Sequence, residues 1–293
     1  MTTELERVPQ TASTPTAERQ CRFCDQPLRR TFVDLGMSPP CESYLTASQL
    51  DQMEPFYPLH VRVCEGCMLV QLHDYIPPED IFTEYAYFSS YSDQWLAHAK
   101  GYAERMADRF GIGRDSLVVE LASNDGYLLQ YFVHEGVPVL GIEPAANVAA
   151  AAETRGVPTL VEFFGVEMAQ RLRDEGTVAD LIAANNVLAQ VPDLNSFVAG
   201  IRTLLAPAGV VTIEFPHLMR LVEENQFDTI YHEHFSYFSF LTTVAILSAH
   251  DLEVFDVEEL WTHGGSLRVY ASPAGQQVHR RTPAVDELLE RER

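Results

Sequence analysis

Apolar runs alternate with helical patterns along the second and larger part of the chain. Each run is short and rich in Val, Ile, Leu and Ala, and each helical pattern follows after a brief polar connection. Such alternation is typical of a parallel, doubly wound sheet with helices on both faces. The strand-like runs cover residues 116–122, 137–143, 157–163, 179–186 and 209–215, and the helical patterns cover 126–136, 145–156, 166–176, 193–209 and 216–225.

The pattern changes after residue 240. Residues 240–252 have the composition of one more helix, whereas 252–260 and 266–273 are two strand-like runs with no helix between them. We therefore expect an antiparallel pair that closes one edge of a mostly parallel, Rossmann-like α/β sheet.

The first part of the chain is organised differently. Residues 20–75 are turn-rich and predict no helix, the prolines of 76–80 interrupt the chain, and Ser92 to Phe110 predict a helix that ends at Gly111. The prediction is a disordered tail at 1–19, a small module at 20–78 and an α/β domain at 79–271. Residues 272–293 look like a linker into a truncated C-terminal α/β domain.

Composition and charge narrow the possible functions. The chain has 293 residues, 46% of them hydrophobic, and a formal net charge of −22, which repels a phosphate backbone. The sequence shows no basic stripe, so we expect no nucleic acid partner. It also has no apolar run of membrane-spanning length and no signal-peptide pattern, which predicts a cytoplasmic protein without a membrane partner. The oligomeric state stays open.

The cysteine spacing indicates a structural metal site. Cys21 and Cys24 form one C-x-x-C knuckle, and Cys64 and Cys67 form a second. Two knuckles complete a closed tetrahedral Zn²⁺ site, because each presents two thiolates from one turn. The alternative is unpaired buried or redox-active thiols. Cys41 lies outside both knuckles and is interpreted as a small apolar residue.

A cofactor pocket is expected beyond the carboxyl ends of the first two strands of the α/β domain. The first loop lacks G-x-G-x-x-G and offers polar and acidic groups, and Glu143 lies at the end of the second strand, where an acidic residue commonly accepts ribose hydroxyls. S-adenosylmethionine, with its ribose, sulfonium and amino acid group, suits both the polar first loop and the acidic residue at the end of the second strand. A solvated strand-end carboxylate is the alternative for Glu143. The candidate cofactor residues here are Glu120, Ala122, Ser123, Asn124, Asp125, Gly126, Glu143 and Pro144.

Two further pairs of residues follow the next strands. Asn185 and Asn186 are candidates to hold the methionine part of the cofactor or to line the reacting face. Phe163 and Phe164 either flank the adenine or belong to the core.

The ordered motifs together resemble a known family. They are the two zinc knuckles, ELASNDG, IEPA, NNVLAQVPD, EFPH and YHEHFSYFS, and they extend from Cys21 to Ala271. The chain resembles the S-adenosylmethionine-dependent C-methyltransferases that act on nucleotide-linked (dTDP) keto-deoxysugars in antibiotic and surface-glycan biosynthesis. The resemblance implies a class I methyltransferase fold with an N-terminal zinc-binding domain.

The resemblance also implies which residues lie at the reacting sugar. They correspond to Tyr85, with Tyr87 as the near alternative, and to Tyr231, Glu233 and His234. Two departures stand out. Relatives carry a histidine where this chain has Gln190, and relatives continue into a C-terminal domain.

The implied reaction needs a base, an oxyanion partner and a dry pocket. We expect methylation of the carbon next to the ketone of a 4-keto sugar through an enolate, with His234 as the base, Tyr85 or Tyr231 donating to the enolate oxygen, and Glu233 orienting the histidine or binding a sugar hydroxyl. An extended segment would place His232 and His234 on one face. The nucleotide and the methylated carbon, C3 or C5, stay open.

Several alternatives compete with this hypothesis. The YHEH segment is also compatible with a satisfied polar core network, or with a metal site of His232, His234 and His263. The whole chain is also compatible with a small-molecule O-methyltransferase, a zinc-ribbon nucleic acid methyltransferase or binding module, or a non-catalytic scaffold.

Overall fold

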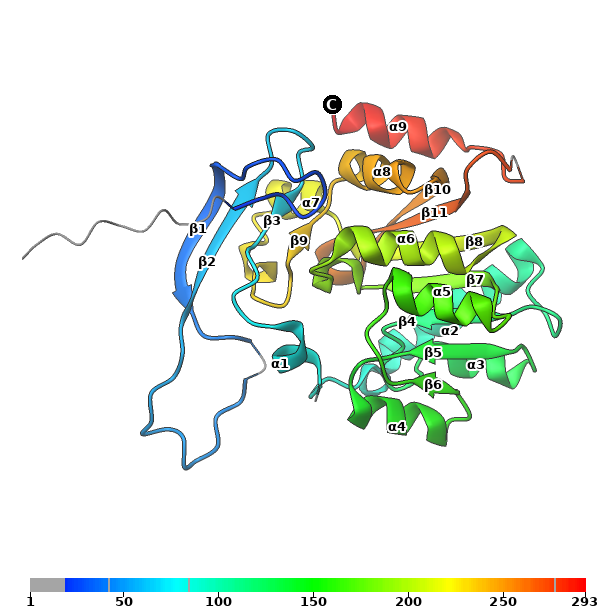
Figure 1. Cartoon of the computed structure of the whole chain (residues 1–293), viewed down its shortest axis with the longest axis horizontal. Coiled ribbons are helices and arrows are strands. Elements are labelled where there is room, and N and C mark those ends of the chain that lie inside the picture. The colour runs from blue at the N-terminus through cyan, green and yellow to red at the C-terminus, as the bar shows by residue number, and fades with distance from the viewer. Residues whose placement is uncertain (1–18, 42, 84, 277) are drawn as a thin grey trace, which may run out of the picture.

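The computed structural model describes residues 19–41, 43–83, 85–276 and 278–293 (Figure 1). Residues 1–18 of the expected tail lie outside this range. The larger of two sheets has seven strands in the order β10-β11-β8-β7-β4-β5-β6. β4 to β8 run parallel to one another, whereas β11 runs antiparallel to both β8 and β10. The predicted parallel sheet with an antiparallel edge is therefore confirmed. Its strands are β4 Val118–Leu121, β5 Val139–Ile142, β6 Thr159–Leu160, β7 Ala179–Asn185, β8 Leu205–Pro216, β10 Leu252–Leu260 and β11 Ser266–Pro273.

Helices cover both faces of this sheet because alternate residues of each strand point to opposite sides. Val119 packs in a core with α5, α6, α8 and α9. Val118 packs in a second core with α2 and α3. The helices are α2 Asp93–Phe110, α3 Leu129–His134, α4 Ala146–Thr154, α5 Val166–Asp174, α6 Leu194–Leu204, α7 Leu218–Glu223, α8 Phe240–Ala249 and α9 Pro283–Arg291, and short turns of helix are α1 Pro78–Phe82, η1 Ser89–Tyr91, η2 Leu188–Gln190, η3 Phe227–Thr229 and η4 Thr262–Gly264.

The helix α2 begins and ends where its sequence signals predict. The hydroxyl of Ser92 accepts a hydrogen bond from the amide of Trp95, which satisfies one of the free amides of the first turn. Gly111 ends the helix with φ of 65°, a conformation that glycine adopts without steric cost. No helix in the described part of the chain is long and apolar enough to cross a membrane.

The smaller sheet has four strands in the order β1-β2-β3-β9. Three come from the N-terminal module, and the fourth comes from the segment that contains the YHEH motif. Phe238, directly after β9, also bridges to His217 beside the large sheet. Residues 231–239 therefore connect the two sheets. The strands are β1 Arg30–Ser38, β2 Tyr57–Val63, β3 Val70–Gln71 and β9 Ser236–Tyr237.

The residues expected to form a linker, 272–293, contain the helix α9, which docks on the domain. Val285 and Leu288 are buried in the core beside α8 and β10. The carboxylate of Glu292 accepts hydrogen bonds from the amides of Phe240 and Leu241 at 2.8 and 2.7 Å, and it lies 2.6 Å from Nε2 of buried His217. These contacts cap the first turn of α8.

Candidate functional site

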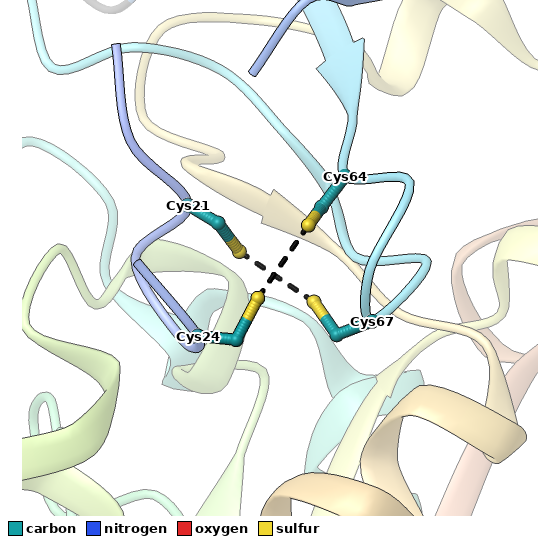
Figure 2. Close-up of side chains that lie close together, drawn as sticks. All are labelled: Cys21, Cys24, Cys64 and Cys67. Atoms are coloured by element: carbon teal, nitrogen blue, oxygen red, sulfur yellow. Dashed lines mark hydrogen bonds between the residues drawn. The ribbon is translucent and has the colours of Figure 1, made fainter. Parts of the chain in front are cut away.

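The four knuckle cysteines converge on one point, as their spacing predicts. Their ligand atoms all lie within 4.8 Å of one another, and Figure 2 shows the sulfur atoms facing inward from two separate turns. The Sγ atoms of Cys21 and Cys67 are 3.5 Å apart, and so are those of Cys24 and Cys64. A tetrahedron of Zn–S bonds of about 2.3 Å has sulfurs about 3.8 Å apart. The cluster therefore fits a closed zinc site.

The described residues contain no other cluster of three side chains that could ligate a metal ion. The alternative metal site of His232, His234 and His263 is therefore wrong. The convergence of four cysteine sulfurs in one half-buried cluster favours a structural Zn²⁺ site over the free-thiol alternative for the knuckles.

The zinc module is coupled to the segment with the YHEH motif. Gln71 donates from Nε2 to Sγ of Cys21 at 3.1 Å, and its backbone pairs with Ser236 of β9. Arg22, inside the first knuckle, donates to the carbonyl of Pro192 at 2.8 Å. Metal ligands held in this way transmit their position to their neighbours. The cluster is thus linked through Gln71 to the strand that follows the YHEH motif.

The loop after β4 replaces glycines by residues that adopt the glycine conformation. Ala122, Asn124 and Gly126, at every second position, have φ of 56°, 49° and 76°. Left-handed backbone costs about 1–2 kcal/mol for a residue with a Cβ atom. The sequence suggested a loop without the glycine-rich turn, but the turn is present with Ala and Asn in two of its places. Small or turn-forming residues at every second position, Ala122, Asn124 and Gly126, were the sequence signal that could have predicted this turn.

Gly126 has no room for a side chain, which gives a testable expectation. A Cβ there would lie 3.1 Å from Cγ2 of Val157 and 3.2 Å from Cβ of Ala152, on a backbone of positive φ. We expect Gly126→Ala to lower the free energy of unfolding by about 1–3 kcal/mol and to weaken cofactor binding. Denaturant titration and calorimetry measure the two effects.

Gly101→Ala is the matched control. This glycine lies inside α2, where nothing is within 4 Å of an added Cβ. It should raise stability by up to about 1 kcal/mol. Equal stability of Gly126→Ala and the unsubstituted protein would refute the close approach.

Glu143 anchors the cofactor loop from the next strand. Its carboxylate accepts hydrogen bonds from the amides of Asn124 and Ala145, both at 2.9 Å. Burial raises the pKa of Glu143, although these amides oppose the rise. Asn124 in turn accepts from the amide of Ser89 at 2.9 Å, which ties the 85–91 segment to the loop.

A cavity of about 500 Å³ lies over these elements, within the usual range of small-molecule sites. Oδ1 of Asn185 and both side-chain polar atoms of Asn186 are buried at its wall without a hydrogen-bond partner among the described residues. Unpaired buried donors and acceptors of this kind suit a polar ligand. Six predicted cofactor residues line the cavity, namely Ala122, Asn124, Glu143, Pro144, Asn185 and Asn186. The other four, Glu120, Ser123, Asp125 and Gly126, are not part of its lining.

Asp125 is not in the cavity lining, and its contacts hold together the elements around the cavity. It is fully buried and lies 3.5 Å from NH2 of Arg155, and its side chain also accepts a hydrogen bond from the hydroxyl of Ser90. Phe163 and Phe164 both line the cavity, and Phe164 also packs against Phe197.

Three of the four predicted catalytic residues line the same cavity. They are Tyr85, Tyr231 and His234, and Gln190 joins them. Glu233 lies behind, where Oε1 accepts from Sγ of Cys41 at 3.0 Å and Oε2 lies 3.4 Å from the hydroxyl of Tyr85. Cys41 is thus a polar contact of the site, and the interpretation as an apolar residue is wrong.

The YHEH segment forms a turn, so the two histidines do not share a face as they would in a strand. His232 is buried beside Tyr57 and is absent from the cavity wall, whereas His234 is part of it. The strand begins only at Ser236.

His234 is held in one tautomer. Nδ1 lies 3.0 Å from the carbonyl of Thr229 and must donate, because a carbonyl only accepts. Nε2, 2.8 Å from the hydroxyl of Tyr231, then accepts. Burial lowers the pKa of His234 to about 4, although the bond to Thr229 opposes this. His234 is therefore a neutral proton acceptor aimed at Tyr231.

A buried ion pair under the site escaped the sequence reasoning. Arg268 of β11 lies 2.8 Å from Glu214 of β8, and both side chains are fully buried. Burial disfavours the Glu214 carboxylate, but His98 and Arg268 outweigh it and lower its pKa. Arg268 and Glu214 are also register partners. Charged residues at inward positions of two apolar strands were the signal that could have found the pair.

Comparison with known proteins places the chain in a family. A methyltransferase domain model matches residues 95–257, more than half of the chain. The chain belongs to the methyltransferase family. A zinc binding domain model matches residues 21–82 of this methyltransferase. Its fold binds S-adenosylmethionine as cofactor, and the cysteine cluster is its zinc site.

Individual relatives agree with this placement. The methyltransferase is 36% identical over 274 residues to C-methyltransferase NovU of Streptomyces niveus. The matched region covers 94% of this chain and 65% of NovU, which is less than two thirds of that relative's length. The PH0226 protein from Pyrococcus horikoshii OT3 superposes with a TM-score of 0.52 at 14% identity, over 67% of this chain and 97% of that one. The second likeness shows the fold alone.

Proposed function

We propose that this methyltransferase transfers a methyl group to the carbon next to the ketone of a nucleotide-linked 4-keto-deoxysugar. One observation carries the proposal. Tyr231 and His234 form a hydrogen-bonded pair, with the histidine as acceptor, in the wall of the cavity that contains the cofactor loop. Methylation of carbon requires removal of a proton from that carbon, and this pair is suited to take it. The name of NovU as a C-methyltransferase agrees with the proposal.

The pair accepts the proton in one concerted movement. The C–H bond next to the ketone breaks, its proton goes to the oxygen of Tyr231, and the tyrosine's own proton moves to Nε2 of His234. The C–H electrons form the enolate. The low pKa of His234 keeps Nε2 unprotonated, and so available, at neutral pH.

The enolate oxygen needs a donor, and Tyr85 is the best placed. Because Tyr231 donates to His234, its hydroxyl is already committed. The hydroxyl of Tyr85 lies 3.4 Å from Oε2 of Glu233, a long contact that a charged oxygen can replace. Glu233 positions Tyr85. Gln190 contributes an amide to the same wall and no titratable group.

The cofactor residues would hold the methyl donor in the same cavity as this pair. Bound S-adenosylmethionine supplies an electrophilic methyl group. Glu143 would accept the ribose hydroxyls, and the unpaired polar atoms of Asn185 and Asn186 would hold the amino acid end. Burial raises the pKa of the Glu120 carboxyl well above its ordinary value, and a cationic group bound nearby would oppose that rise.

The test offers the full-length protein a panel of nucleotide 4-keto-6-deoxysugars with S-adenosylmethionine in heavy water. We expect deuterium at one carbon next to the ketone and a new carbon-bound methyl group at that position in the NMR spectrum. A methoxy signal would establish the O-methyltransferase alternative instead. If no sugar of the panel is methylated, the proposal is wrong.

A further inference from the structure

A second histidine, His263, reaches the cavity from the turn between β10 and β11. It lies in η4 and lines the same cavity as Tyr231 and His234. Its backbone is left-handed, with φ of 51° and ψ of 38°. This conformation is uncommon for a residue other than glycine, and strained residues of this kind gather at functional sites.

The surrounding structure holds this turn firmly. The hydroxyl of Thr262 donates to Oε1 of Glu214 at 3.2 Å, Gln226 donates to the carbonyl of Gly264 at 2.7 Å, and the amide of His217 donates to the carbonyl of Gly265 at 3.0 Å. Trp95 contacts the imidazole ring edge-on, with ring centroids 5.4 Å apart. The position of His263 on the wall is therefore fixed by four neighbours.

The imidazole of His263 differs from that of His234 in its hydrogen bonds. Both nitrogens of His234 are engaged, by Thr229 and Tyr231. Neither nitrogen of His263 has a hydrogen-bond partner within the described residues, and His263 is an exposed residue that lines the cavity. Such a ring can take up or release a proton without breaking an existing bond.

The proposed reaction also produces a proton that has to leave the site. The acceptor carbon exchanges a C–H bond for a C–C bond, the S–CH₃ bond breaks with its electron pair staying on sulfur, and one proton is released for each methyl group transferred. His234 has both ring nitrogens engaged, by the carbonyl of Thr229 and the hydroxyl of Tyr231, so it has no free nitrogen that could pass a proton directly to water.

We propose that His263 is a second acid–base group of this site, which receives the proton from the Tyr231–His234 pair and passes it to solvent. This role rests on the proposed function. The proton leaves Nε2 of His234 through the hydroxyl of Tyr231, binds a nitrogen of His263, and then transfers to water in the open part of the cavity.

The charges around His263 fit this role. Burial lowers the pKa of His263, Glu214 opposes that change, and His98 adds to it. The positive charge of a protonated His263 in turn lowers the pKa of His234, after the larger effect of burial. A proton on His263 therefore disfavours a proton on His234.

The test compares His263→Asn with the unsubstituted protein on the sugar panel. Asparagine tolerates left-handed backbone, and His263→Gly is a second variant that keeps this conformation without strain. We expect methyl transfer about 100-fold slower in both variants, an unchanged dissociation constant for S-adenosylmethionine, and recovery of at least about tenfold with added imidazole. His134→Asn, whose side chain is 84% exposed on the surface, is the control.

The outcomes separate the role of His263 from the function itself. Methyl transfer within threefold of the unsubstituted rate in His263→Asn and His263→Gly would overturn the relay and leave the sugar methyltransferase intact, as would a loss that imidazole does not restore. If the unsubstituted protein methylates no sugar of the panel, the proposed function is refuted and the relay with it.

Discussion

Replacing Tyr231 by phenylalanine, or His234 by asparagine, is expected to reduce methyl transfer by at least about 1000-fold. The dissociation constant for S-adenosylmethionine should stay within about twofold. The expectation follows from the direction of one hydrogen bond, in which the tyrosine donates to Nε2 of a neutral histidine. Phenylalanine has no oxygen to receive the substrate's proton, and asparagine has no basic nitrogen to take the tyrosine's. Rates measured by product NMR and affinities measured by calorimetry check both parts.

The two variants need controls that change the same chemical groups elsewhere. Tyr44→Phe removes the hydroxyl of a tyrosine that is 78% exposed, and His134→Asn removes an exposed imidazole. Both should be fully active. If Tyr231→Phe or His234→Asn weakens cofactor binding as much as it slows methyl transfer, the pair supports the structure of the site and is not the base.

Removal of zinc is expected to abolish methyl transfer, because it disturbs the small sheet that positions the catalytic pair. A structural Zn²⁺ contributes about 10–16 kcal/mol of apparent binding free energy in zinc-finger peptides. Without it the two knuckles separate, and Gln71, which bonds Cys21 and pairs with Ser236, loses its position. The Tyr231–His234 pair lies directly before that strand. The cofactor loop belongs to the large sheet, so S-adenosylmethionine binding should decline much less than activity.

The measurement combines metal analysis with hydrogen exchange. The protein should contain one zinc per chain, and a chelator or Cys64→Ser should remove it and increase exchange at residues 231–239 while β4 and β7 stay protected. Cys41→Ser is the matched control for zinc content, because Cys41 lies outside the cluster. Full activity in metal-free protein would contradict the coupling between the zinc module and the site.

Much of the fold was predictable from residues that are close in sequence. Hydrophobic periodicity predicted the strands from β4 to β8, the antiparallel pair β10 and β11, and the helix α2, and Gly111 predicted where that helix ends. The C-x-x-C spacing gave all four zinc ligands. Strand-end positions gave six residues that line the cavity, because the carboxyl ends of parallel strands meet at one edge of a sheet.

What the sequence by itself determined, then, was the α/β class, the zinc cluster and the edge of the sheet that carries the site. Only the tertiary structure decided that Ser236 and Tyr237 join the small sheet, that Glu214 faces Arg268, and that His263 reaches the same cavity as His234. The reason is physical. Periodicity and knuckle spacing depend on local backbone geometry, whereas these contacts join residues from separate elements and depend on how those elements pack in three dimensions.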